Sequence, residues 1–193
     1  MKKAAWTPLL LMAAVALATG CTNKQGETES PVFITVSLDL QPGFVDVGTV
    51  APVQIQTINL ASRLKNPQQS DPQGFATVTL ESYTVHFHRT DGGTRVPPDL
   101  NFPVGVIIPS GSTATLTNFP VLPASQIQLS PFDQLLPFNG GFDRETGKAE
   151  IDTAFDITFF GHTVSGQRVQ STTATGPLLF RFIAAAGSRN SIR

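Results

Sequence analysis

Apolar and polar residues alternate along most of the chain after residue 31. This period of two is typical of β-strands that bury one face and expose the other. The clearest case is AEIDTAFDITFFG at residues 149–161, in which every second residue from Ile151 to Phe159 faces one way. Further extended segments are predicted at residues 32–40, 53–62, 75–90, 104–108, 112–121, 167–175 and 178–183. The sequence therefore predicts about eight strands, of which residues 104–108 form a short buried run.

Two of these segments change the parity of their apolar residues once. A single extra residue in a strand, a β-bulge, restores such a pattern to one face. The sequence predicts one bulge near Thr57, within residues 53–62, and one at Glu81-Ser82, within residues 75–90. We expect residues 75–90 to be the longest strand and residues 161–166 to be a turn.

Many short strands separated by Gly and Pro predict an all-β, antiparallel β-sandwich of about 7–9 strands with one short helix. From the strand with Tyr83 onward, the segments TLESYTVHFHRTDGG and DITFFGHTVSGQRV resemble an immunoglobulin-like domain of bacterial surface proteins. The resemblance implies an immunoglobulin-like sandwich. The Cys…Trp…Cys core of true immunoglobulin domains is missing, because the only Trp and the only Cys precede residue 22.

The segment PFDQLLPFNGGF contains the only helix start that we identify. Ser130 is suited to cap the helix and Pro131 to occupy its first turn. Before it, residues 127–129 are expected to be extended. The apolar residues of the segment either close the open end of the sandwich or form an exposed patch that docks a partner. The candidate partner-binding residues are Phe132, Leu135, Leu136 and Phe138.

The N-terminal residues MKKAAWTPLLLMAAVALATGC have the layout of an export signal: a basic start, a short apolar core and small residues at the cut. The end, Ala18-Thr19-Gly20-Cys21, resembles the lipobox of bacterial lipoproteins, although the family prefers Leu where this chain has Ala18. The resemblance implies a lipid anchor on Cys21. Because Thr22 is not Asp, it also favours the outer membrane in a diderm. The alternative is an ordinary cleaved signal followed by a stray cysteine.

We therefore divide the chain into a signal peptide (1–20), a lipidated Cys21 with a flexible tether (21–31), a sandwich domain (32–185) and a mobile tail (186–193). Fully extended, the tether would reach about 35 Å from the anchor. Without the two lysines of the signal, 11 basic residues stand against 14 acidic ones. This balance argues against nucleic acid as a partner and against electrostatic docking on anionic lipid.

His86 and His88 lie two apart in a predicted strand, on the face that the parity assigns to solvent. Two imidazoles at this spacing bind Zn²⁺ or Cu²⁺ if a third ligand is close. The alternative is a solvated strand face without metal.

A set of carboxylates lies near residues 143–156. Oxygen-rich clusters suit Ca²⁺, but the spacing is not that of a known calcium loop. Solvated charges that protect a sheet edge are the alternative. The residues are Asp143, Glu145, Glu150, Asp152 and Asp156.

No nucleophile elbow, phosphate loop or dinucleotide fingerprint is present in the sequence, so we expect no enzyme and no cofactor. The function expected is a membrane-anchored lipoprotein with a non-catalytic binding or accessory domain and an envelope protein as partner. The alternative is a carrier of metal or a small ligand that uses the face with His86 and His88.

Overall fold

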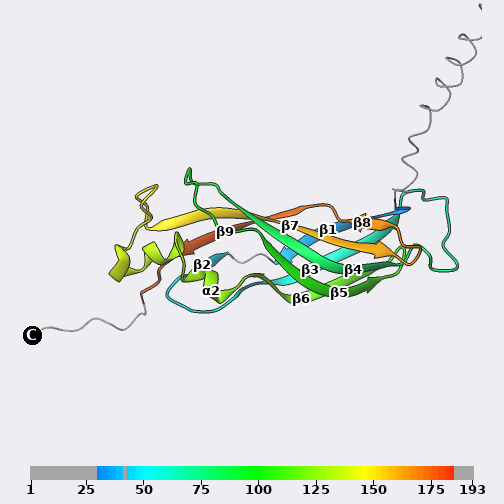
Figure 1. Cartoon of the computed structure of the whole chain (residues 1–193). Helices are drawn as coiled ribbons and strands as arrows, with labels where there is room; N and C mark the ends of the chain where they lie inside the picture. The colour runs from blue at the N-terminus through cyan, green and yellow to red at the C-terminus, as the bar shows by residue number, and fades with distance from the viewer. Residues whose placement is uncertain (1–29, 41–42, 185–193) are drawn as a thin grey trace, which may run out of the picture.

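In a computed structural model of the chain, which describes residues 30–40 and 43–184, the alternating segments form two sheets packed face to face (Figure 1). The strands are β1 (Val32–Leu40), β2 (Phe44–Asp46), β3 (Val53–Leu64), β4 (Val78–Arg89), β5 (Leu100–Ile108), β6 (Thr113–Leu122), β7 (Glu150–Thr163), β8 (Arg168–Gln170) and β9 (Ala174–Arg181). The predicted all-β sandwich is confirmed.

One sheet has the order β1-β3-β6, and the other has the order β2-β9-β7-β4-β5, with β8 also paired to β7. All pairings are antiparallel except that of β2 with β9. The N-terminal part of the chain contributes an edge strand to each sheet: β1 to the smaller sheet and β2 to the larger one. This order, with the chain passing repeatedly between the sheets, is that of an immunoglobulin-like sandwich.

The centre of the core joins the two sheets through Tyr83 of β4. Its ring lies 4.4 Å from that of Phe119 in β6 and 5.5 Å from that of Phe159 in β7, measured between centroids. Its hydroxyl donates a hydrogen bond of 2.7 Å to the carbonyl oxygen of Pro120. Burial raises the pKa of the Tyr83 phenol, so the hydroxyl keeps this proton across the physiological range.

The predicted bulge at Glu81-Ser82 is confirmed. The register of β4 shifts between Leu80 and Ser82 against both neighbouring strands. Residues on both sides of the shift, such as Leu80 and Tyr83, are buried. Opposite the bulge, Gly161 pairs with Leu80.

The apolar parity does change near Thr57, since Ile55 and Ile58 are both fully buried, but the predicted bulge within residues 53–62 is wrong. The extra residue lies in the partner strand, because the register of β1 against β3 shifts between Leu38 and Leu40.

Four other local predictions are wrong. Residues 104–108 are not a buried run, since β5 alternates along the edge of its sheet and Ile107 is 68% exposed. The longest described strand is β7, with 14 residues, and it includes Gly161, which the sequence placed in a turn. Ile127 belongs to a helix, α2 (Ala124–Ile127), rather than to an extended segment.

The predicted helix after Ser130 exists only as two 3-10 turns, η1 (Phe132–Leu135) and η2 (Pro137–Asn139). Ser130 does not cap it; its hydroxyl accepts a hydrogen bond of 2.8 Å from the amide of Gln134.

The signal peptide, Cys21, nearly all of the tether and the C-terminal tail lie outside the described residues. Within the described part, no helix is long and apolar enough to cross a membrane.

Candidate functional site

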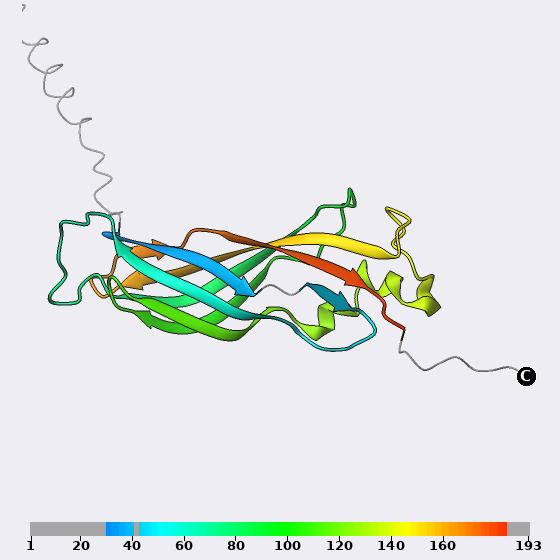
Figure 2. The same ribbon diagram turned by 180° about the vertical axis from the view of Figure 1, so that it is seen from behind.

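The sandwich has two unlike ends, which Figures 1 and 2 show from opposite sides. One end carries the first described residues and the loops around residues 65–77 and 164–167; we call it the N-terminal end. The other carries residues 90–99 and 123–149; we call it the loop end. With 14 residues at about 3.3 Å each, β7 spans on the order of 45 Å between the two.

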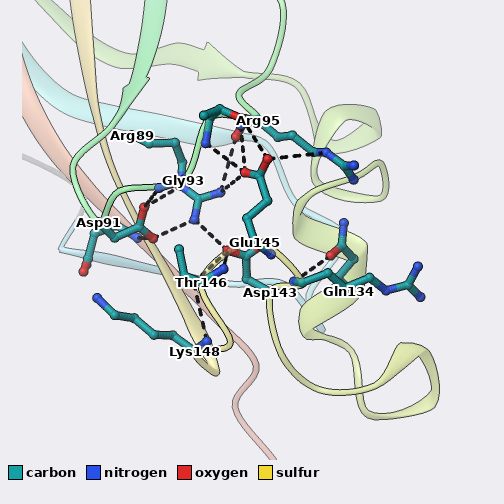
Figure 3. A network of polar contacts seen from close by, with 12 residues as sticks. Arg89, Asp91, Gly93, Arg95, Gln134, Asp143, Glu145, Thr146 and Lys148 are labelled. Carbon is teal, nitrogen blue, oxygen red and sulfur yellow. Dashed lines mark hydrogen bonds and ion pairs between the residues drawn. The ribbon is translucent and has the colours of Figure 1, made fainter.

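The loop end is organised around Arg89, the last residue of β4 (Figure 3). Its Nε and one terminal nitrogen donate to the two carboxylate oxygens of Asp91, each at 2.7 Å. The same terminal nitrogen donates to Asp143 at 2.8 Å. The three side chains are at most 1% exposed. They form a buried ionic cluster that joins the end of β4 to a loop more than 50 positions later.

The excess negative charge of the cluster is stabilised by hydrogen bonds from backbone N–H groups and from one hydroxyl. The Asp91 carboxylate accepts from the backbone N–H of Gly93 and of Asp152, both at 3.1 Å. The Asp143 carboxylate accepts from the hydroxyl of Thr146 at 2.7 Å and from its backbone N–H at 3.1 Å. A buried ion pair needs such additional partners to offset the loss of water.

A second carboxylate joins the same two loops at the surface. Glu145 accepts hydrogen bonds from the hydroxyl of Thr94 at 2.7 Å and from the backbone N–H of Thr94 and Arg95 at 2.8 and 3.0 Å. The loop after β4 and the loop before β7 therefore form one unit.

Burial alone would raise the pKa of both buried carboxyls. The hydrogen bonds and charge of Arg89 outweigh it: the pKa of Asp91 is lowered to about 2, and that of Asp143 is lowered as well. The pKa of Arg89, which burial alone would lower, is raised by the two carboxylates. All three groups are thus ionised at neutral pH and hydrogen-bonded to one another, which is the arrangement of a structural ion cluster rather than of an acid–base pair.

This cluster gives the protein a pH-dependent stability. The folded-state pKa of Asp91 lies below the value of about 3.9 for an unfolded chain, so its contribution is complete above about pH 5 and is lost as the pH falls towards 2. We expect a loss on the order of 2–3 kcal/mol from this group. Urea unfolding between pH 5 and 2 measures it. Asp91→Asn should show a shallower dependence than the wild type, and equal slopes would contradict the assignment.

Two of the five carboxylates expected either to bind Ca²⁺ or to be solvated instead hold the loops together. Asp143 is buried against Arg89, and Glu145 accepts hydrogen bonds from the loop after β4. Asp152 and Asp156 do not protect a sheet edge, since β7 lies between β4 and β9. The hydroxyl of Thr175 donates to Asp156.

The four predicted partner-binding residues lie in two environments. Phe132 and Leu135 are buried, and the Phe132 ring stacks on Phe180 of β9 at 3.8 Å between centroids. Leu136 packs against the core in part. Burial removes Phe132 and Leu135 from a contact surface: they close the end of the sandwich. Phe138 is 81% exposed.

Two more large apolar side chains, Leu129 and Phe142, are exposed on the same segment as Phe138. The backbone under them is fixed by polar contacts. The Asn139 amide donates to the carbonyl oxygen of Asp133 at 2.9 Å, and the buried Gln134 accepts from the backbone N–H of Arg144 at 3.0 Å. The loop end thus presents exposed apolar groups on an ordered loop.

His86 and His88 share the solvent face of β4, as predicted, with ring centroids 6.5 Å apart. Each imidazole contacts a different carboxylate: His86 Nδ1 lies 2.6 Å from Asp99 and His88 Nδ1 lies 3.7 Å from Asp156. In the described part of the chain, no group of three or more His, Cys, Asp or Glu side chains is placed to bind a metal ion. Nothing there supplies the third ligand that the metal hypothesis requires.

These features define an immunoglobulin-like β-sandwich with an ordered, partly apolar loop end. Comparison with protein-family models, curated proteins and solved structures found no match to this chain.

Proposed function

We propose that the protein is an exported lipoprotein, anchored through acyl chains on Cys21, whose sandwich is a non-catalytic binding module of the cell envelope. The lipobox-like sequence supports the anchor, and Thr22 favours the outer membrane in a diderm. The loop end binds an envelope protein through Leu129, Phe138 and Phe142.

The observation that carries the binding role is the exposure of Phe138 on an ordered loop. A phenylalanine that is 81% exposed adds little to the core, and solvent exposure of several large apolar groups in one segment is typical of a contact surface. Because the ionic cluster orders the loops beforehand, little conformational entropy is lost when a partner binds. The loop end also lies at the opposite end of the sandwich from the start of β1, where the described chain begins.

We expect Phe138→Ser to change the free energy of unfolding by less than about 0.5 kcal/mol, as for an exposed side chain, and to weaken association with the partner by about tenfold or more. Association is measured by cross-linking in envelope membranes, followed by titration of the identified partner. Ile107→Ser is the matched control, because Ile107 is a large apolar side chain, 68% exposed, on β5 and away from the loop end. Loss of association in both variants, or in neither, would contradict the assignment to the loop end.

Phe132→Ser tests whether the buried residues of the same segment close the end of the sandwich. Because Phe132 is buried against Phe180, we expect a loss of about 3–5 kcal/mol in the free energy of unfolding. Urea unfolding measures this change.

A further inference from the structure

We infer that the N-terminal end of the sandwich rests on the lipid bilayer, with the side chains of Phe75 and Val164 in the interfacial region. The inference rests on the proposed anchor at Cys21 and adds which surface of the domain meets the membrane.

The chain enters the domain at this surface. The carbonyl oxygen of Pro31 accepts a hydrogen bond of 2.8 Å from the backbone N–H of Lys65. Pro31 also lines a surface hollow of about 350 Å³ together with Phe75 and Ser165. Eight residues lie between Cys21 and Ser30, and the nine steps of about 3.3–3.6 Å each reach at most about 30 Å. An acylated Cys21 therefore keeps this end, and not the loop end, close to the bilayer.

Phe75 and Val164 are both exposed at this end, with 55% and 60% of their surfaces accessible. They come from two loops that are joined through the backbone. The N–H of Val164 donates to the carbonyl oxygen of Thr77 at 2.9 Å, and the N–H of Ser165 donates to that of Phe75 at 3.3 Å. An aromatic and a branched aliphatic side chain on a joined pair of loops suit the boundary between headgroups and acyl chains.

Two basic side chains lie at the end of β3, at the same end of the sandwich. Arg63 and Lys65 line a second hollow, of about 560 Å³, with the exposed Phe33 at its side. Asp71 also lines this hollow, but its carboxylate accepts a hydrogen bond of 2.9 Å from the backbone N–H of Ala76. Apolar side chains and two cations at one end of the sandwich match the acyl chains and phosphates of a bilayer surface, although the domain as a whole is acidic.

The test uses single-tryptophan versions of the full chain in a Trp6→Phe background, purified from membranes and reconstituted into phosphatidylcholine–phosphatidylglycerol vesicles with brominated acyl chains. Phe75→Trp and Val164→Trp probe the N-terminal end, and Phe138→Trp is the matched control at the loop end. We expect a blue-shifted emission and several-fold stronger bromine quenching for the first two than for the control.

Flotation of the vesicles separates the two proposals. If the protein floats with the vesicles but Phe75→Trp is quenched no more than Phe138→Trp, the seating surface is wrong and the anchor stands. A blue shift without quenching would show that another part of the chain or a second copy covers the surface, which also overturns the inference. If the protein does not float, the anchor and the inference fail together.

Discussion

We expect Gly161→Ala to lower the free energy of unfolding by at least about 3 kcal/mol, or to prevent folding altogether. A Cβ at this position would lie 2.0 Å from the carbonyl oxygen of Thr79 and 2.7 Å from the Cα of Leu80. Both atoms belong to the backbone of β4 beside its bulge, so no side-chain rotation relieves the contact. The two central strands of the larger sheet would have to separate. Urea unfolding of the purified domain measures the effect.

Gly105→Ala is the matched control, because Gly105 lies in the adjacent strand β5 with nothing within 4 Å of an added Cβ. We expect a change of less than about 1 kcal/mol, in either direction. Similar losses at the two glycines would show that strand propensity, and not the close approach at the bulge, determines the result.

The second large effect is expected at the ionic cluster. Arg89→Met keeps most of the side-chain volume but leaves the carboxylates of Asp91 and Asp143 buried without their cation. Removing one partner of a buried ion pair costs about 3–5 kcal/mol. Because the two loops would then be joined by the hydrogen bonds to Glu145 and no longer through Arg89, association through Phe138 should weaken along with stability. Urea unfolding and partner titration measure the two changes.

Arg95→Met provides the comparison. Arg95 is 58% exposed, and its Nε lies 3.7 Å from Glu145. Exposed pairs of this kind contribute about 0–1 kcal/mol. If Arg95→Met destabilises the protein as much as Arg89→Met, burial of the cluster is not the source of its contribution.

Features that depend on neighbouring residues could be predicted from the sequence. Strand periodicity depends only on the order of apolar and polar residues along the chain. The same holds for the parity changes near Thr57 and at Glu81-Ser82, and the structure shows both changes. The turn boundary at Gly161 could not be predicted, because a glycine suggests a turn and its real role is to lie opposite the bulge of β4. The order of strands in a sheet could not be predicted either. The expectation that Asp152 and Asp156 protect a sheet edge is therefore wrong, because β7 lies between β9 and β4.

The ionic cluster could not be predicted, because its members are distant in the sequence and none belongs to a motif. Arg89 and Asp143 are 54 positions apart. Charged residues in loops are usually solvated, which made the surface interpretation of Asp143 reasonable. The sequence does contain Asp91-Gly92-Gly93 close after Arg89. In the structure, a Cβ on Gly93 would lie 2.3 Å from the guanidinium carbon of Arg89. A glycine that makes room for an arginine is visible only once the loop is folded.

The anchor at Cys21 is the claim on which the proposed localisation and the proposed orientation on the membrane both depend. Mass spectrometry of the mature protein from envelope membranes tests it most directly. We predict that the first residue is Cys21, carrying acyl chains on its sulfur and its amine. A mature chain in which Cys21 is unmodified, or in which residues 1–20 remain attached, would contradict the account.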